Sequence, residues 1–200
     1  GTPMKAKTIS VEIDDFKLKG PAERMVQLFA LGMLSQTLPP AANVQPISAG
    51  DIPAIGEHWP GEGGINAGFV PARGDVPAHY LILGTKSLGE LKWGRYKEES
   101  KAISKWDGKA NTDALIAAGG HPAAEAARAY TADGHSDFDL PAASQLYQVW
   151  AYDLIAEGAY WSSSQRSALS AFGMHFDAGS QYNLGKNDEL HVRPVRRKFI

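Results

Sequence analysis

The chain has 200 residues and a mass of 21.5 kDa, which is long enough for one domain with a sizeable core. Twenty basic residues against 22 acidic ones give a formal net charge of −2, which excludes the broadly basic surface of a non-specific nucleic-acid-binding protein. The sequence contains no cysteine, so disulfides, thiolate metal sites and a cysteine nucleophile are excluded. No apolar run reaches the roughly 20 residues that cross a bilayer, so we expect no membrane insertion.

The first residues indicate where the native chain starts. Gly1–Pro3, ahead of Met4, are typical of the remnant of a cleaved tag, and no apolar signal segment follows, which predicts cytoplasmic synthesis. Alternating apolar residues predict a strand over 7–18, and apolar residues at helical spacing predict a helix over 22–34. We therefore expect a strand–helix extension over residues 4–45. The apolar side of its helix either belongs to the core or is an oligomer or partner face, and it comprises Met25, Leu28, Phe29, Leu31 and Leu34.

A Pro- and Gly-rich segment over residues 46–77 is predicted to be a linker or a long loop, and residues 78–200 form the main domain. In that domain the sequence predicts strands over 79–83 and 88–96, followed by helices over 112–118, 122–130 and 140–156. Three more strands are expected over 159–163, 169–177 and 189–196. We expect the strand near residue 160 and the final strand to belong to one sheet.

Several motifs follow one another in this domain. They are Trp-Asp-Gly at 106–108 with Asn-Thr at 111–112, Asp-Phe-x-Leu-Pro at 137–141, Tyr-Trp-Ser-Ser-Ser at 160–164, and Val-Arg-Pro-Val-Arg at 192–196. In this order they resemble a bacterial and phage domain family of unknown function, related to the C-terminal domain of collagen-like bacterial adhesins. The resemblance covers about residues 80–197. It implies an α+β, C-type-lectin-like fold with small twisted antiparallel sheets and two to three helices, similar to formylglycine-generating enzymes and phage tropism determinants.

Some motif residues are expected to build the framework. Trp106 and Trp161 are assigned a structural role, and the Tyr-Trp pair at 160–161 supplies large buried area. The serines over 162–164 can satisfy backbone groups where their strand ends. Arg193 and Arg196 can bind carboxylates or carbonyls and hold the C-terminal edge, where a proline between them fits only an edge strand or a bulge.

The resemblance implies that ligands meet loops and short strands after the Trp-Ser-Ser segment, here about residues 164–186. Polar and aromatic side chains in this stretch offer the adaptable hydrogen bonds and rigid contact area of a binding surface, although an ordinary polar loop would look the same. The candidate ligand-binding residues are Gln165, Arg166, Ser167, His175, Gln181, Tyr182, Asn183 and Asn187, with Ser170 and Ser180 beside them.

Metal sites were weighed against solvated surface patches. If strands 172–177 and 189–195 formed a hairpin, His175, Asp177, Glu189 and His191 would become neighbours with the chemistry of metal ligands. A second candidate, Asp133, Asp137 and Asp139, offers oxygen ligands for calcium but lacks the spacing of an EF-hand loop. We favour a solvated patch for the first candidate and a structural turn for the second. We therefore expect no metal or other cofactor.

Two further readings are weaker. The serines over 162–164 with His175 or His191 and Asp177 could suggest a nucleophile, but no Gly-x-Ser-x-Gly elbow is present. The absence of cysteine also excludes the oxidase chemistry of the formylglycine-generating relatives. A basic terminus could contact phosphates, although a solvated tail is the simpler interpretation; it comprises Arg193, Arg196, Arg197 and Lys198.

These observations favour a non-catalytic binding module, encoded by a phage or prophage, that recognises a protein or glycan through the loops after Trp161. The alternative is a phage structural or assembly protein, associated with the virion, that forms a homo-oligomer through its N-terminal unit.

Overall fold

In a computed structural model, the structure describes residues 8–13, 16–21 and 52–199, and the chain divides into two compact units, residues 1–46 and 47–200. In the first unit, β1 (Thr8–Ile13) pairs antiparallel with β2 (Phe16–Pro21), with Val11 opposite Leu18. The prediction of a single strand over 7–18 is therefore wrong, because two aspartates separate two segments of alternating apolar and polar residues that pair with each other. The predicted helix over 22–34 and its apolar face lie outside the described residues.

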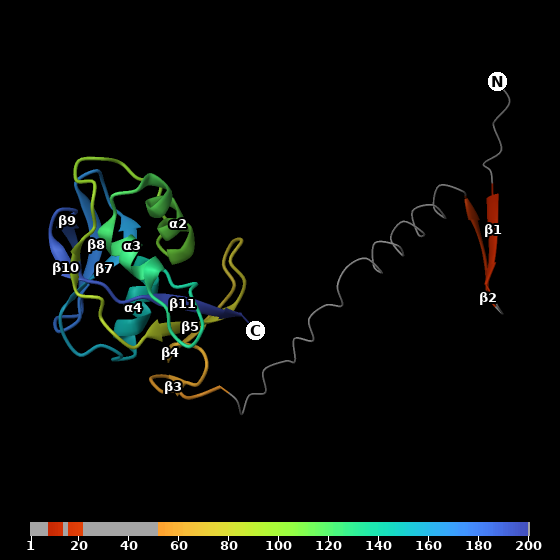
Figure 1. The fold of residues 1–200 in the computed structure, drawn as a ribbon, viewed down its shortest axis with the longest axis horizontal. Helices are drawn as coiled ribbons and strands as arrows, with labels where there is room; N and C mark the ends of the chain where they lie inside the picture. The colour runs from red at the N-terminus through yellow and green to blue at the C-terminus, as the bar shows by residue number, and fades with distance from the viewer. Residues whose placement is uncertain (1–7, 14–15, 22–51, 200) are drawn as a thin grey trace, which may run out of the picture. The chain divides into compact units, whose positions relative to one another are not determined.

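Residues 52–199 form an α+β unit with three helices and two sheets (Figure 1). The helices are α2 (Gly108–Ala118), α3 (Pro122–Ala129) and α4 (Ala143–Ala151), close to the three predicted positions. α2 begins earlier than predicted because the side chain of Asp107 accepts a hydrogen bond from the backbone N–H of Ala110, at 2.9 Å, and caps the helix. α4 ends earlier because Asp153, just beyond it, has a φ of +53°.

The first sheet contains five strands in the order β6-β10-β7-β8-β9. β10 runs parallel to β7, and the other neighbours are antiparallel. The strands are β6 (Glu90–Lys92), β7 (Ala159–Gln165), β8 (Ser170–His175), β9 (Ser180–Gly185) and β10 (Glu189–His191).

The second sheet contains four antiparallel strands in the order β11-β5-β4-β3. They are β3 (His58–Trp59), β4 (Gly64–Val70), β5 (His79–Gly84) and β11 (Val195–Phe199). The second half of the predicted linker over 46–77 therefore belongs to this sheet. Its glycines permit close strand packing rather than a loop: a Cβ on Gly64 would lie 2.2 Å from the carbonyl oxygen of Leu83, and Gly68 has a φ of +98° beside a register shift.

The strand near residue 160 and the final strand lie in different sheets, which contradicts the expectation of a single sheet. β10 pairs with β7 at His191, whereas β11, the next strand along the chain, pairs with β5 in the other sheet. Pro194 lies at the crossing: it has no N–H to donate, and its carbonyl accepts a hydrogen bond of 2.8 Å from the backbone N–H of Gly84. α4 packs against β7 and β8 of one sheet and against β4 of the other, so this helix joins the two sheets (Figure 1).

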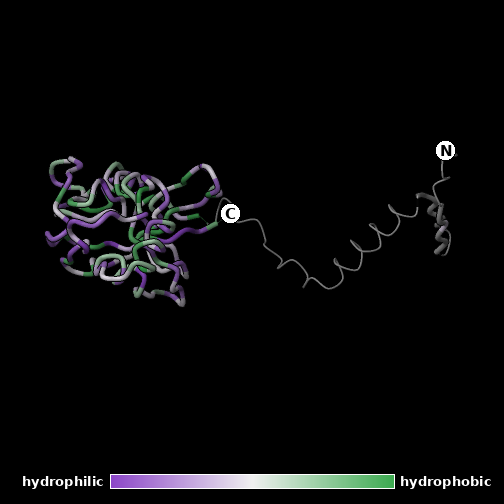
Figure 2. The backbone as a smooth tube through the Cα atoms, turned by 90° about the horizontal axis from the view of Figure 1, so that it is seen from above, coloured by the Kyte–Doolittle hydropathy of each residue, from purple (hydrophilic) through white to green (hydrophobic). Residues whose placement is uncertain are grey.

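Two cores result from this arrangement. Successive residues of a strand point to opposite faces, so Trp161 joins a cluster with Trp93 and the alanines of α3, whereas Tyr160 joins Leu81, Leu146 and other residues of the second sheet and α4. Trp161 is 0% exposed, as the sequence predicts. Along the tube in Figure 2, hydrophobic and hydrophilic stretches alternate, as expected for short strands and loops that each contribute a few residues to the cores.

Candidate functional site

The most exposed part of the predicted binding region is β9, an edge strand of the five-stranded sheet. It carries Gln181, Tyr182 and Asn183, all exposed, and Tyr182 keeps 48% of its surface accessible. The Tyr182 ring packs edge-on against the imidazole of His175 on β8, with 4.9 Å between ring centroids. These residues lie on one of the short strands expected in this stretch, so their backbone is held by the β8–β9 pairing.

The register of this hairpin divides the predicted residues between two faces. Tyr182 lies opposite Gly173, and Asn183 lies opposite Phe172, so Tyr182 and Asn183 point to opposite sides of the sheet. The guanidinium carbon of Arg166 lies 5.9 Å from the centroid of the Phe172 ring. The structure therefore pairs Tyr182 with His175 on one face, and on the other face it places Arg166 by Phe172, the residue opposite Asn183.

Two turns complete this region. Ser167 and Ser170 close the turn between β7 and β8, with 3.0 Å between their hydroxyl oxygens. Asn187 is exposed in the turn between β9 and β10, which the backbone N–H of Asp188 closes by donating to the carbonyl of Gly185 at 2.9 Å. Both turns are short and hydrogen-bonded, so they hold their exposed side chains in fixed positions relative to β9.

Gln165 does not belong to this surface, which corrects its assignment as a ligand-binding residue. Its side chain is buried, and its carbonyl oxygen accepts hydrogen bonds from the backbone N–H of Ser100 at 2.7 Å and from the ammonium of Lys186 at 2.6 Å. Its amide nitrogen donates to the carboxylate of Glu99. Gln165 therefore ties the loop before α2 to the five-stranded sheet.

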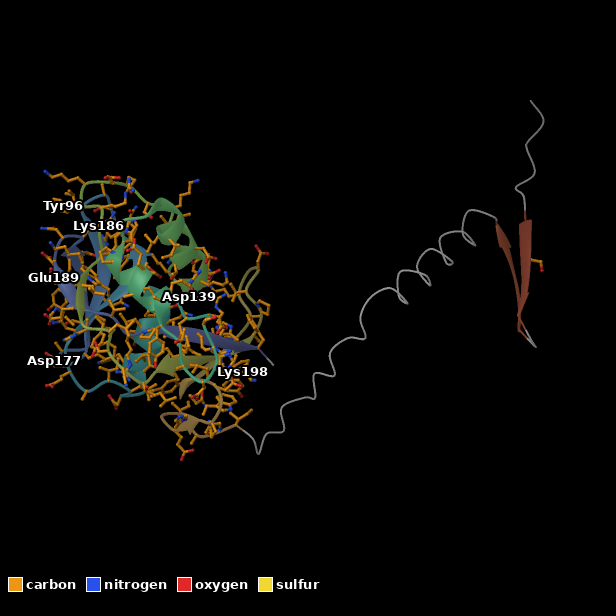
Figure 3. The ribbon with its side chains drawn as sticks, in the orientation of Figure 1. Tyr96, Asp139, Asp177, Lys186, Glu189 and Lys198 are labelled. Carbon is orange, nitrogen blue, oxygen red and sulfur yellow. The ribbon has the colours of Figure 1, made fainter. Side chains whose placement is uncertain are left out.

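Lys186 is the charged residue whose position the sequence did not predict. It is 0% exposed, and its ammonium donates to the carbonyl of Glu98 at 2.6 Å and lies 4.6 Å from the ring centroid of Trp93. Burial lowers the pKa of Lys186, because the neutral amine costs less to bury than the ammonium. Figure 3 shows Lys186 near Tyr96, well away from Lys198. Nothing in the local sequence distinguishes this lysine from a surface one.

The three serines after Trp161 serve the framework. All are buried; Ser162 donates to the carbonyl of Phe172 at 2.8 Å, and Ser164 donates to the carbonyl of Ser104 at 2.7 Å. Ser163 accepts from the amide of Asn111 at 3.2 Å. These hydroxyls satisfy buried polar groups, as predicted, and neither His175 nor His191 is among the partners of the described serines.

The register also contradicts the proposed metal cluster. β8 pairs with β7 and β9 rather than with β10, so β7 separates His175 from His191. Asp177 instead accepts a hydrogen bond from the backbone N–H of Gly158 at 2.8 Å, which lowers its pKa, and Glu189 lies 3.9 Å from Lys92. Within residues 52–199, no group of three or more histidines, aspartates or glutamates is arranged to hold a metal ion.

The three aspartates over 133–139 contact separate partners. Asp133 accepts from the backbone N–H of Gly63 at 3.1 Å, Asp137 pairs with Arg196 at 2.9 Å, and Asp139 pairs with Arg128 at 2.5 Å. Their oxygens are therefore directed to three different donors rather than toward a common centre.

The basic C-terminal residues form a paired strand instead of the expected solvated tail. Arg196 is buried between Glu62 and Asp137, Arg197 pairs with Asp107, and Lys198 lies 2.6 Å from Glu62. Arg193 donates to the carbonyl of Gly84. Arg193 and Arg196 thus have the type of partner the sequence predicts, whereas Trp106, also assigned to the framework, remains 40% exposed.

No protein-family model matches the sequence, and a search among curated proteins finds none with significant similarity. Among the described residues, no helix has the length and apolar character needed to span a membrane.

Proposed function

We propose that the chain is a non-catalytic binding module, encoded by a phage or prophage, whose residues 52–199 adopt a C-type-lectin-like variant of the α+β fold. Its ligand is a protein or glycan. The binding surface, called the β9 rim below, reaches around the free edge of β9, with Tyr182 and His175 on one face of the sheet and Gln181 and Asn183 on the other. It comprises Arg166, Ser167, His175, Gln181, Tyr182, Asn183 and Asn187.

One observation carries the proposal: a half-exposed tyrosine rests edge-on against His175 on an edge strand. Tyrosine offers a large contact area at a small cost in side-chain entropy, and the neighbouring amides can donate and accept hydrogen bonds. The strand is anchored from behind by buried residues whose polar groups are satisfied, such as Gln165 and the serines of β7. A rigid support of this kind lowers the entropic cost of binding.

The test is a screen of the full chain against arrays of glycans and bacterial surface proteins, followed by titration of the ligand found. Tyr182→Ala should weaken binding about 30-fold, because central aromatic contacts dominate such interfaces. Tyr147→Ala is the matched control, since Tyr147 is 50% exposed and lies on α4. An equal loss in both variants, or unchanged binding by Tyr182→Ala, would reject the β9 rim.

A second candidate function is that of a phage assembly protein. The separate N-terminal unit favours this function. Its described part is a two-stranded hairpin, and an isolated hairpin of this size is marginally stable in water. Light scattering of the full chain tests this function. A strict monomer, or an oligomer that survives deletion of residues 4–40, would contradict it.

A further inference from the structure

A pocket of about 200 Å³ lies away from the β9 rim, between the loop that joins β4 to β5, the residue before the N-cap of α2 and the first half of α4. Val70 and Val76 provide apolar walls, and the other residues that the argument uses are Arg73, His79 and Trp106. In Figure 1 this loop lies near the C-terminal end of β11, consistent with the pairing of Phe199 with His79. The volume is below the roughly 300 Å³ at which drug-sized sites begin, so it suits a small ligand.

Arg73 and Trp106 form the mouth of the pocket. The guanidinium carbon of Arg73 lies 4.1 Å from the centroid of the Trp106 ring. Trp106 is held in place because the next residue, Asp107, caps α2 and pairs with Arg197. Arg73 has no ion-pair partner within residues 52–199. A guanidinium supported on an aromatic face keeps its edge N–H groups available, and this edge matches a carboxylate.

His79 adds a buried, uncharged ring to the lining of the pocket. It is 1% exposed, and its Nδ1 lies 2.8 Å from the carbonyl oxygen of Pro77. A carbonyl can only accept, so Nδ1 carries the proton and Nε2 of the neutral ring is an acceptor. Among the described residues, Nε2 has no hydrogen-bond partner, but it also has almost no accessible surface, so a ligand in the pocket does not reach it. Burial lowers the pKa of His79, which keeps the ring neutral at pH 7.

We propose that this pocket binds a small organic acid: its carboxylate pairs with Arg73, and its flat or apolar body lies against Trp106, Val70 and Val76. The carboxylate of the ligand matches the cation at the mouth, and its apolar body matches the apolar walls. The site is independent of the β9 rim and does not rest on the function proposed for it.

The test titrates the full chain with three probes of similar size. Binding is monitored by NMR through the indole resonance of Trp106. We expect 4-hydroxybenzoate to bind with a roughly millimolar Kd, as befits so small a ligand. 4-Hydroxybenzamide lacks the charge for Arg73, so it should bind at least about fivefold more weakly, whereas 4-fluorobenzoate keeps the charge and should bind about as tightly.

Variants separate this proposal from non-specific binding. Arg73→Gln should weaken 4-hydroxybenzoate at least about fivefold, whereas Lys86→Gln, which removes an equal charge from an exposed loop, should leave its Kd unchanged. Three results would overturn the proposal. These are no shift at about 20 mM probe, equal affinities for 4-hydroxybenzoate and 4-hydroxybenzamide, and wild-type affinity in Arg73→Gln.

Discussion

Gln165→Leu tests whether the buried network around Lys186 supports the five-stranded sheet. The substitution keeps the approximate size of the side chain but removes the oxygen that accepts from Lys186 and Ser100, at 2.6 and 2.7 Å. It also removes the amide that donates to Glu99. Because Lys186 is fully buried, no water replaces the lost acceptor unless the structure opens.

The magnitude follows from the two donors left behind. A hydrogen bond to a charged group contributes about 1.5–3 kcal/mol, and an unsatisfied buried N–H such as that of Ser100 costs about 1–3 kcal/mol. The additional apolar surface of leucine offsets part of this loss. We therefore expect Gln165→Leu to lower the free energy of unfolding by about 3 kcal/mol, near the upper end of what single substitutions do.

Urea denaturation, monitored by tryptophan fluorescence, measures the effect. Gln181→Leu, the same change on exposed β9, should alter the free energy of unfolding by no more than about 0.5 kcal/mol. Adding Lys186→Met should recover part of the loss, because the unpaired buried ammonium is then removed. A loss below about 1 kcal/mol, or effects of Gln165→Leu and Lys186→Met that simply add, would refute the coupling of these residues.

Three further results are expected. Trp161→Ala should lower the free energy of unfolding by about 3–5 kcal/mol in the same urea assay, because a fully buried indole is lost; a loss under about 1 kcal/mol would contradict its place in the core. Tyr182→Ala should change stability by no more than about 0.5 kcal/mol, and a loss comparable to that of Trp161→Ala would mean that Tyr182 belongs to the core. Burial lowers the pKa values of His79 and His121 from 6.5, so the unfolded state binds more protons than the folded state below that pH. The free energy of unfolding should therefore fall as the pH drops below 6.5. Urea midpoints that stay constant between pH 7 and about 5 would contradict this expectation.

Local patterns predicted the elements of the main domain better than their pairing. The three helices lie close to their predicted positions, because apolar spacing and flanking glycines and prolines are local signals, whereas the cap at Asp107 was missed and α2 begins earlier than predicted. The glycines of β4 suggested a loop, yet Gly64 is required where the backbone of β5 approaches. Close approach between distant strands leaves no trace in the local sequence, so this strand could not be predicted.

The candidate site shows the same limit. Residue types alone predicted that Tyr182 is exposed, and its 48% exposure agrees with that expectation. Gln165 looked equally suitable because a glutamine is polar wherever it lies, and only the tertiary contact with Lys186 reveals that it is buried. The metal hypothesis failed because it assumed a hairpin between neighbouring segments, whereas β9 intervenes and β10 pairs with β7.

Amide hydrogen exchange with and without the ligand from the array screen measures most directly whether the β9 rim binds. Slower exchange over residues 166–170 and 180–187, with no change over β11, is the pattern we predict. Protection centred on β11 and β5, with residues 180–187 unaffected, would show that the ligand binds elsewhere.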